Sequence, residues 1–365
     1  MEPKRIFING ASGRIGTGVT HEFFSNPLLR GLEVVAMNDS KGIDYTTGVY
    51  NENDSVHGLY NWAIRKIGDK ELSINSKPIR FYKETDLSKI PFEDLGIDVV
   101  MECSGFYGDP KKDNPKPEDN GGREFLKYGV KRVIETYPAK TADISMIFGC
   151  NSQLYDPAKH RIISNASCTT KSIAGPLKVL LDNGFDIDDV RMVTVHAATG
   201  SQQVLESIGQ IVLHSTGAAK ATGLVLPVLK GKMGGTSARV PTLDGSISYV
   251  SVVAYSCNPN FNADEINNLY SKASMNPIYE QRIGLIQKEK VNGKEPKIGT
   301  NDIIGRRENA LIVPSETQVG RLRASANGMS GYHIWFVSGY DNELGSAVDP
   351  CLLAKYILQD APKSK

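Results

Sequence analysis

The sequence predicts an α/β protein built from two domains, and three observations support this prediction. The chain has 365 residues, which is more than one typical domain contains. Its first half alternates short β-branched runs with helical stretches, which predicts a doubly wound parallel sheet with helices on both faces. From about residue 186 the apolar pattern changes to longer alternating runs, which predict an α+β domain with a mixed or antiparallel sheet.

This change of pattern also sets the expected domain boundaries. Residues 1–167 are expected to form the first domain, and residues 168–341 the second. A last helix, within about 342–365, is expected to pack back on the first domain.

The first half supplies the parallel strands and their helices. Apolar, β-branched runs predict the strands, and glycine-opened or apolar-periodic stretches predict the helices. We expect strands at 4–10, 32–39, 96–105, 144–151 and 161–167, a helix at 12–26, and a helix followed by a strand within 121–134. The Pro-, Lys- and Asp-rich stretch 108–122 is predicted to be a solvated loop insertion.

The second half is predicted to contain long strands and two helices. Alternating apolar residues predict strands within 186–200, 239–256 and 331–342. Residues 262–274 have helical periodicity, and Asn262 is a suitable N-cap. Residues 350–360 have helical periodicity as well.

Composition excludes several classes of protein. The formal net charge of +1 gives no general reason to expect nucleic acid as the main partner. No apolar run approaches the roughly 18 residues of a membrane span, and the N-terminus has no signal-peptide core. Five scattered cysteines without CxxC spacing favour reduced thiols and argue against a metal cluster, so we expect a cytoplasmic protein without a metal.

A glycine-rich turn follows the first strand and opens the first helix. Gly10, Gly13 and Gly16 allow the backbone to approach a pyrophosphate, which the helix N-terminus attracts. Asp39, at the end of the next strand, is placed to bind an adenosine ribose and would repel a 2′-phosphate, which favours NAD. This context indicates a Rossmann-like domain. The alternative is a glycine-rich turn that binds no ligand.

Cys168 lies where a strand ends and a helix is expected to begin. A thiolate is stabilised at a helix N-terminus, and Lys171 would add to that effect if its side chain points toward the sulfur. The alternative is a buried cysteine that acts only as a small apolar residue. His196 ends a predicted strand and is a candidate base, although it could equally be a structural histidine, because spacing alone does not bring it to Cys168.

Several motifs, spread over nearly the whole chain, resemble one enzyme family. The sequence resembles the phosphorylating, NAD-dependent glyceraldehyde-3-phosphate dehydrogenases, as a divergent member. The motifs that carry the resemblance are "INGASGRIG" (8–16), "VVAMND" (34–39), "NDSVHG" (53–58), "SNASCTT" (164–170), "VHAATGSQ" (195–202), "STGAAKATGLVLPVLKGKMGGTSARVPT" (215–242) and "GYDNELG" (339–345).

The resemblance implies a covalent mechanism. Cys168 would attack the aldehyde of a phosphorylated substrate as a thiolate and form a thiohemiacetal. His196 would hold the thiolate as an ion pair and then act as general base, while the backbone N–H of Cys168 would stabilise the oxyanion. Hydride transfer to NAD would leave a thioester, and inorganic phosphate would release an acyl phosphate.

The resemblance also implies a set of binding residues. The expected cofactor-binding residues are Gly10, Gly13, Arg14, Ile15, Asp39, Ser104 and Asn342, the last holding the nicotinamide carboxamide. Thr199, Ser201 and Arg239 match positions near the substrate's phosphate, and Ser167, Thr169, Thr216 and Gly217 match the pocket for the attacking phosphate. A homo-oligomer, either a tetramer or a dimer, is also implied.

The sequence departs from the family in places that bear on substrate and acceptor. Segment 201–214 is short and lacks the arginine that the family carries there, and the glycine turn has one extra residue. Lys171 stands after "SCTT", and Tyr137 lies in "TYPAK" near the expected nicotinamide. One alternative is therefore a related dehydrogenase for another anionic aldehyde with a non-phosphate acyl acceptor. Another is a non-catalytic nucleotide-binding protein.

Overall fold

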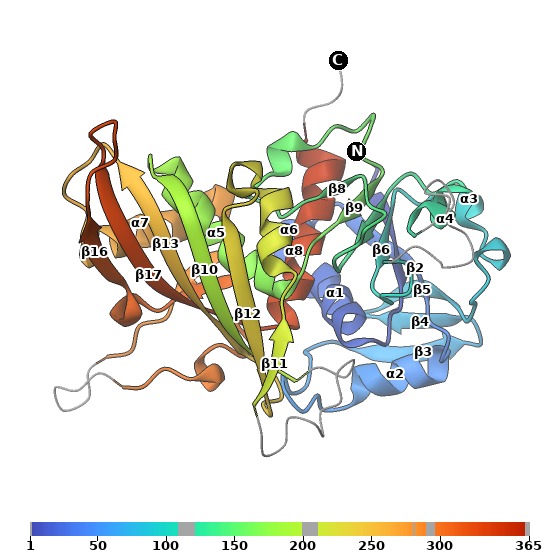
Figure 1. Ribbon diagram of the computed structural model, residues 1–365. Coiled ribbons are helices and arrows are strands. Elements are labelled where there is room, and N and C mark those ends of the chain that lie inside the picture. The colour runs from blue at the N-terminus through green and yellow to red at the C-terminus, as the bar shows by residue number, and fades with distance from the viewer. Residues whose placement is uncertain (1, 109–120, 199–210, 280–281, 290–295, 362–365) are drawn as a thin grey trace. The chain divides into compact units, whose positions relative to one another are not determined.

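The chain folds into two compact units, each with its own sheet. Unit 1 comprises residues 1–166 and 346–365, and unit 2 comprises residues 167–345 (Figure 1). The computed structural model describes residues 2–108, 121–198, 211–279, 282–289 and 296–361.

Unit 1 contains a nine-stranded, mostly parallel sheet in the order β3-β4-β5-β2-β1-β6-β7-β9-β8. The parallel strands are β1 (Lys4–Asn9), β2 (Leu32–Asn38), β5 (Lys77–Tyr82), β6 (Val99–Glu102), β7 (Val133–Glu135), β8 (Ile144–Ser145) and β9 (Ile162–Ser164). β3 (Ile64–Gly68) and β4 (Glu71–Ile74) add an antiparallel edge. The strand order reverses at β1, where such sheets bind ligands beyond their carboxyl ends.

Helices flank the sheet of unit 1 and bury its central strands. They are α1 (Arg14–Ser25), α2 (Ile43–Asn51), α3 (Phe92–Leu95) and α4 (Arg123–Leu126), with short 3₁₀ turns at Pro27–Leu29, Leu87–Lys89 and Ser152–Leu154. α8 (Leu344–Lys355) continues as a π-helical turn, Tyr356–Asp360. α8 packs closely on α1, because a Cβ on Gly18 would lie 2.8 Å from the Cβ of Ala347.

Unit 2 contains an eight-stranded mixed sheet in the order β11-β12-β10-β13-β17-β15-β14, with β16 paired to β17. Its strands are β10 (Asp186–Ala197), β11 (Val212–Ser215), β12 (Met233–Val240), β13 (Ser246–Ser256), β14 (Ile283–Leu285), β15 (Ala310–Ile312), β16 (Gln318–Leu322) and β17 (Ser330–Tyr340). β10 runs parallel to β12 and antiparallel to β13. The fold class expected from the sequence is therefore confirmed.

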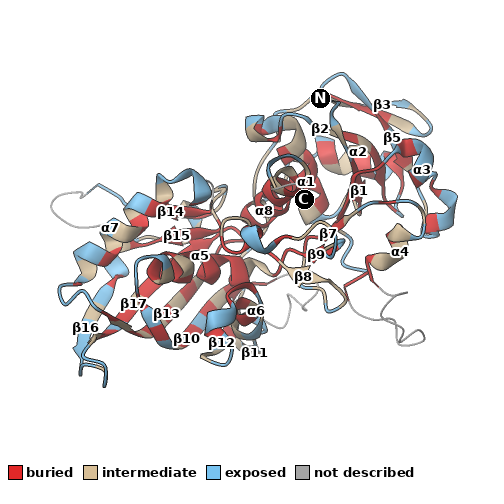
Figure 2. Cartoon of the chain, turned by 90° about the horizontal axis from the view of Figure 1, so that it is seen from above, coloured by how far each residue is buried: buried red, intermediate tan, exposed pale blue. Residues whose placement is uncertain are grey.

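Helices pack on one face of the unit 2 sheet. They are α5 (Cys168–Asp182), α6 (Ala218–Val225) and α7 (Ala263–Ser274), with 3₁₀ turns at Pro227–Leu229, Pro277–Tyr279, Thr300–Asp302 and Pro314–Glu316. α5 is buried along most of its length (Figure 2). Strand residues alternate, since Val250 and Phe336 are fully buried beneath the helices, whereas their neighbours Tyr249 and Trp335 are partly exposed. As expected, the side chain of Asn262 caps α7 by accepting from the backbone N–H of Glu265 at 3.0 Å.

Two local expectations were wrong or incomplete. The expected strand at 144–151 is reduced to Ile144–Ser145, because Asn151 closes a turn there. Its side chain accepts from the backbone N–H of Ile147 at 3.0 Å and donates to the carbonyl of Ser145 at 2.9 Å. The edge strands β3 and β4 were not anticipated. Within the described residues, no helix is both long enough and apolar enough to cross a bilayer.

Candidate active site

Cys168 is the first residue of α5, at the end of a tight connection from β9. Ala166 has a left-handed backbone, with φ 55°, which turns the chain into the helix. The Ser167 hydroxyl then caps α5 by accepting from the backbone N–H of Thr170 at 3.1 Å. The sulfur of Cys168 therefore lies beside the positive end of the helix, where a thiolate is stabilised.

His196 lies near the end of β10 and reaches Cys168. Its ring is 5% exposed, and Nε2 is 3.3 Å from the sulfur of Cys168. The structure thus brings together the two residues that the sequence proposed as nucleophile and base but that spacing alone did not connect. This geometry is typical of a nucleophile–base pair.

Burial and neighbouring charges both act on the protonation of Cys168 and His196. Burial and, as the second cause, the charge of Arg239 together lower the pKa of His196 to about 4. Burial also raises the pKa of the Cys168 thiol, against the opposing effects of the Lys171 ammonium, of Thr169 and of Arg239. Burial therefore opposes the charged forms of both groups, whereas Lys171 and Thr169 favour the thiolate.

Tyr340, at the end of β17, contacts both α5, which carries Cys168, and β10, which carries His196. Its hydroxyl lies 2.9 Å from the hydroxyls of both Thr169 on α5 and Thr194 on β10. Its ring centroid lies 5.9 Å from that of His196. The sequence analysis did not find this residue, and its position directly before the "DNE" motif was the available signal.

The residues expected to bind the attacking phosphate have local hydrogen-bond partners. Besides capping α5, the Ser167 hydroxyl contacts that of Thr170 at 2.8 Å, and the Thr169 hydroxyl contacts Tyr340. The Thr216 hydroxyl accepts from the backbone N–H of Ala218 at 3.2 Å, and Gly217 lies at the N-cap of α6. Thr199 and Ser201 lie outside the described residues.

Arg239 contacts the ring of His196 through its guanidinium. In the parallel pairing of β10 and β12, Arg239 lies directly opposite His196. Nη1 donates to Nδ1 of His196 and, at 2.9 Å, to the carbonyl of Ala197. Nε of Arg239 is buried and has no hydrogen-bond partner in the described part of the chain.

The glycine turn of unit 1 allows a close approach of the backbone. Gly10 has φ 78°, and a Cβ there would lie 2.7 Å from the backbone nitrogen of Ser104. A Cβ on Gly16 would lie 2.1 Å from the carbonyl oxygen of Gly10. Gly13 is the N-cap of α1 and has no side chain to cap the first turn, which begins with Arg14 and Ile15. Such a bare helix N-terminus is suited to bind a pyrophosphate.

Asp39 and Ser104 lie at the carboxyl ends of the neighbouring strands. The Asp39 carboxylate accepts from the backbone N–H of Ser12 at 2.8 Å and of Lys41 at 2.9 Å, which orients it. The backbone N–H of Ser104 donates to the buried carboxylate of Glu102 at 2.7 Å. Both residues line a hollow of about 340 Å³ together with Asn9, Gly10, Ser12, Gly13, Asn38, Ser40, Lys41, Glu84, Thr85, Cys103, Phe106 and Tyr107.

These features of unit 1 fit NAD. The hollow combines closely approaching glycines, an open helix start and an oriented carboxylate for the ribose hydroxyls. The sequence analysis named the glycines and Asp39, but it did not find Ser12, which holds that carboxylate through both its N–H and its hydroxyl.

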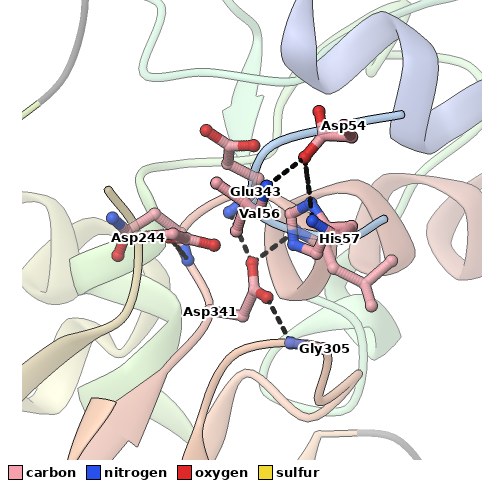
Figure 3. A network of polar contacts seen from close by, with 9 residues as sticks. Asp54, Val56, His57, Asp244, Gly305, Asp341 and Glu343 are labelled. Atoms are coloured by element: carbon pink, nitrogen blue, oxygen red, sulfur yellow. Dashed lines mark hydrogen bonds and ion pairs between the residues drawn. The ribbon is translucent and has the colours of Figure 1, made fainter. Parts of the chain in front are cut away.

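Asn342 lies in unit 2, in the turn between β17 and α8. Its backbone N–H donates to Asp244 at 3.0 Å, and its side-chain Oδ1 is buried without a hydrogen-bond partner in the described residues. The neighbouring carboxylate of Asp341 fixes the turn by accepting from the backbone N–H groups of Gly305 and Glu343 at 2.8 and 2.9 Å (Figure 3). The turn therefore holds an amide oxygen that has no partner in the described part of the chain.

A dinucleotide-binding unit and a second unit with a cysteine–histidine pair together define an NAD-dependent dehydrogenase that uses a cysteine nucleophile. Comparison with known families agrees. Residues 4–110 match "Glyceraldehyde 3-phosphate dehydrogenase, NAD binding domain", and residues 167–327 match the C-terminal domain of the same enzyme. The chain belongs to the glyceraldehyde-3-phosphate dehydrogenase family.

Individual relatives cover nearly the whole chain. The chain is 34% identical to glyceraldehyde-3-phosphate dehydrogenase of Chlamydia muridarum, over 97% of this chain and 98% of the relative. It is also 34% identical to glyceraldehyde-3-phosphate dehydrogenase 1 of Bacillus subtilis, with the same coverage. The chloroplastic glyceraldehyde-3-phosphate dehydrogenase B of Pisum sativum is 35% identical over 75% of this chain and 60% of the relative.

Proposed function

We propose that this protein oxidises glyceraldehyde 3-phosphate with NAD and inorganic phosphate and forms an acyl phosphate. The observation that carries the proposal is the 3.3 Å approach of His196 Nε2 to the sulfur of Cys168 at the start of α5. Family membership supports the same reaction. The alternatives, a different acyl acceptor or a non-catalytic protein, are not favoured by relatives that match over their full length.

The first chemical step forms a carbon–sulfur bond. The sulfur of Cys168 attacks the aldehyde carbon and the π bond of the carbonyl breaks. The thiol proton passes by way of Nε2 of His196 to the carbonyl oxygen, which becomes the hydroxyl of a thiohemiacetal. The backbone N–H of Cys168, at the start of α5, would stabilise the developing oxyanion.

The second step oxidises the adduct. The hydroxyl proton passes to Nε2 of His196 as a hydride leaves the same carbon, so that the carbon–oxygen double bond re-forms as a thioester. When bound, NAD supplies the hydride acceptor. A phosphate oxygen then attacks the thioester carbon, the carbon–sulfur bond breaks, and Cys168 is regenerated with release of the acyl phosphate.

We assign Arg239 and the nearby hydroxyl groups to the binding of two anions, the phosphate of the substrate and the attacking phosphate. A guanidinium recognises phosphate through paired N–H groups, and Arg239 has a buried Nε–H to offer. Ser167, Thr169, Thr216 and Gly217 surround the helix starts of α5 and α6, where a second phosphate would meet hydroxyls and backbone N–H groups.

An NADH absorbance assay tests the proposal. Glyceraldehyde 3-phosphate should give NADH only when inorganic phosphate or arsenate is present, and Cys168→Ser should abolish the reaction. NADH formation that does not depend on phosphate would indicate another acyl acceptor. No NADH from a panel of phosphorylated aldehydes, with a folded protein that binds NAD, would contradict the enzyme assignment.

We also propose that the protein is a homo-oligomer in the cytoplasm. The face of the unit 2 sheet opposite α5 carries apolar side chains, including Val193 at 43% and Leu213 at 77% exposure, and Tyr249 and Trp335 extend it over the next two strands, β13 and β17. A second copy of the protein would bury these apolar side chains if it packed its own sheet against this face. Analytical ultracentrifugation should show a dimer or tetramer that Val193→Lys dissociates. None of the five cysteines, all of which lie within the described ranges, forms a disulfide, and this suits a reducing compartment.

A further inference from the structure

We propose that Glu135 lets unit 1 distinguish oxidised from reduced NAD, because its carboxyl holds a proton more firmly in the NADH complex than in the NAD⁺ complex. Glu135 is thus a specificity-determining residue that acts through its charge. The inference rests on the use of NAD in the proposed function, but not on which aldehyde is oxidised.

Five polar residues form a row along the carboxyl ends of the parallel strands of unit 1. They are the last residues of β2, β1, β6, β7 and β9, and each lies directly opposite the next: Asn38, Asn9, Glu102, Glu135 and Ser164. All five are buried. The row lies at the edge of the sheet that carries the cofactor hollow, since Asn9 and Asn38 also line that hollow.

The hydrogen bonds of the row point toward a negative charge on Glu102. The side-chain N–H of Asn38 donates to Oδ1 of Asn9 at 2.8 Å, and Nδ2 of Asn9 donates to Oε2 of Glu102 at 2.5 Å. Oε1 of Glu102 accepts from the backbone N–H and the hydroxyl of Ser104 at 2.7 and 2.5 Å. Burial raises the pKa of Glu102 to about 6 against these donors, so this carboxyl is ionised at neutral pH.

Glu135 has a much poorer set of donors. Its Oε1 accepts from the backbone N–H of Gly122 at 3.1 Å, and its Oε2 is buried without a hydrogen-bond partner in the described residues. Glu102 lies directly opposite on the adjacent strand, and two neighbouring buried carboxyls do not both ionise readily. Glu135 is therefore the member of this pair that keeps its proton.

The charges around Glu135 leave it sensitive to one further charge. Burial is the largest cause that raises the pKa of Glu135, to about 8, and the charges of Glu102 and Asp143 raise it as well, whereas Arg123 lowers it. Arg123 and Asp143 form an ion pair with each other, so their effects largely cancel. Burial raises the pKa of the nearby Tyr137, which therefore stays neutral. Glu135 is then close to half protonated near pH 8.

The two forms of the cofactor differ by one positive charge. The nicotinamide ring is cationic in NAD⁺ and neutral in NADH, whereas the phosphates and riboses are the same in both. A positive charge favours the ionised form of a nearby carboxyl. Because Asn9 and Ser104 both line the hollow and bind Glu102, the carboxyl pair lies directly behind its wall. The pKa of Glu135 is therefore lower with NAD⁺ bound, and its proton passes to solvent.

The test counts the protons exchanged when the cofactor binds. The full chain is titrated calorimetrically with NAD⁺ and with NADH, without any aldehyde, in buffers that differ in their enthalpy of ionisation. For a pKa that differs by about one unit between the complexes, the NADH complex should hold about half a proton more at pH 8 and almost none more at pH 6 or pH 10. Equal proton numbers at pH 8 would overturn this inference alone. Failure of the folded chain to bind either form would contradict the proposed function with it.

Substitutions identify the group that carries the proton. Glu135→Gln, which keeps the shape of the side chain but cannot ionise, should abolish the difference. The matched control Glu33→Gln, at a partly exposed glutamate on β2, should retain it. Cys168→Ser should retain it as well, whereas a difference lost in Cys168→Ser and kept in Glu135→Gln would place the proton on the catalytic pair and refute the role of Glu135.

Infrared spectroscopy gives a second measurement that needs no variant. A protonated carboxylic acid has a carbonyl band that the ionised carboxylate lacks. At pH 8 this band should be stronger in the NADH complex of the unaltered protein than in its NAD⁺ complex. An identical band in the two complexes would contradict the inference even if Glu135→Gln fails to fold.

Discussion

Tyr340→Phe removes one oxygen atom that joins the strand and the helix of the catalytic pair. The hydroxyl bonds to Thr169, the residue after Cys168, and to Thr194, two residues before His196, at 2.9 Å each. Both threonines are buried, at 6% and 1% exposure, so the substitution leaves polar groups without their partner. Thr194 keeps contacts to Ser248 and to the carbonyl of Ile247, but the Thr169 hydroxyl loses its partner on β17.

The expected cost follows from these contacts. An unsatisfied buried hydroxyl costs about 1–3 kcal/mol, and we expect the free energy of unfolding to fall by that amount. Because Cys168 and His196 then lose a common support, we also expect kcat to fall while the KM for phosphorylated substrate changes little.

Urea unfolding and steady-state NADH formation measure the two effects. Tyr249→Phe is the matched control, because Tyr249 lies on the same sheet, on its partly exposed face, and its hydroxyl has no hydrogen bond in the described residues. If Tyr340→Phe unfolds at the same urea concentration as Tyr249→Phe and keeps full kcat, the hydroxyl does not support the pair.

Three other changes test separate parts of the structure. Gly10→Ala should weaken NAD binding in a fluorescence titration and lower the melting temperature, because φ is 78° and the new Cβ would lie 2.7 Å from Ser104; unchanged binding would contradict the close approach. Asp39→Ser should reduce the preference for NAD over NADP, since the carboxylate that repels a 2′-phosphate is lost; an unchanged kcat/KM ratio would contradict its role. The pKa of His196 is lowered to about 4 from the 6.5 of the unfolded chain, so unfolding takes up a proton between these values. Acidification from pH 6.5 to 4 should therefore cost up to about 3 kcal/mol of stability, a loss that should be smaller in His196→Gln.

Local sequence patterns predicted much of the fold and several residues of the candidate site. The strand–glycine–helix arrangement around Gly10 and the helix start at Cys168 are both local features, set by backbone conformation and capping within a few residues. The alternating pattern that ends at His196 likewise predicted β10. Such features can be predicted because few distant contacts compete with them.

Other features depend on contacts between distant segments. The approach of His196 to Cys168 requires the packing of α5 on β10, and the role of Tyr340 requires the end of β17 to bring its hydroxyl to both elements. The contact of Arg239 with Nδ1 of His196 depends on the register of β10 and β12, because the two residues are 43 positions apart in the sequence. At 144–151 a side-chain contact of Asn151 overrode the β-propensity of the apolar run.

The most direct test of the account is to trap the acyl group on the protein. The chain with NAD bound is mixed with glyceraldehyde 3-phosphate in the absence of inorganic phosphate, and the digested protein is analysed by mass spectrometry alongside the NADH burst. We predict one NADH per subunit and an acyl group on Cys168 that is released when phosphate is added. A burst without an adduct, or an adduct on Cys103, Cys150, Cys257 or Cys351 instead, would contradict the claim that Cys168 is the nucleophile.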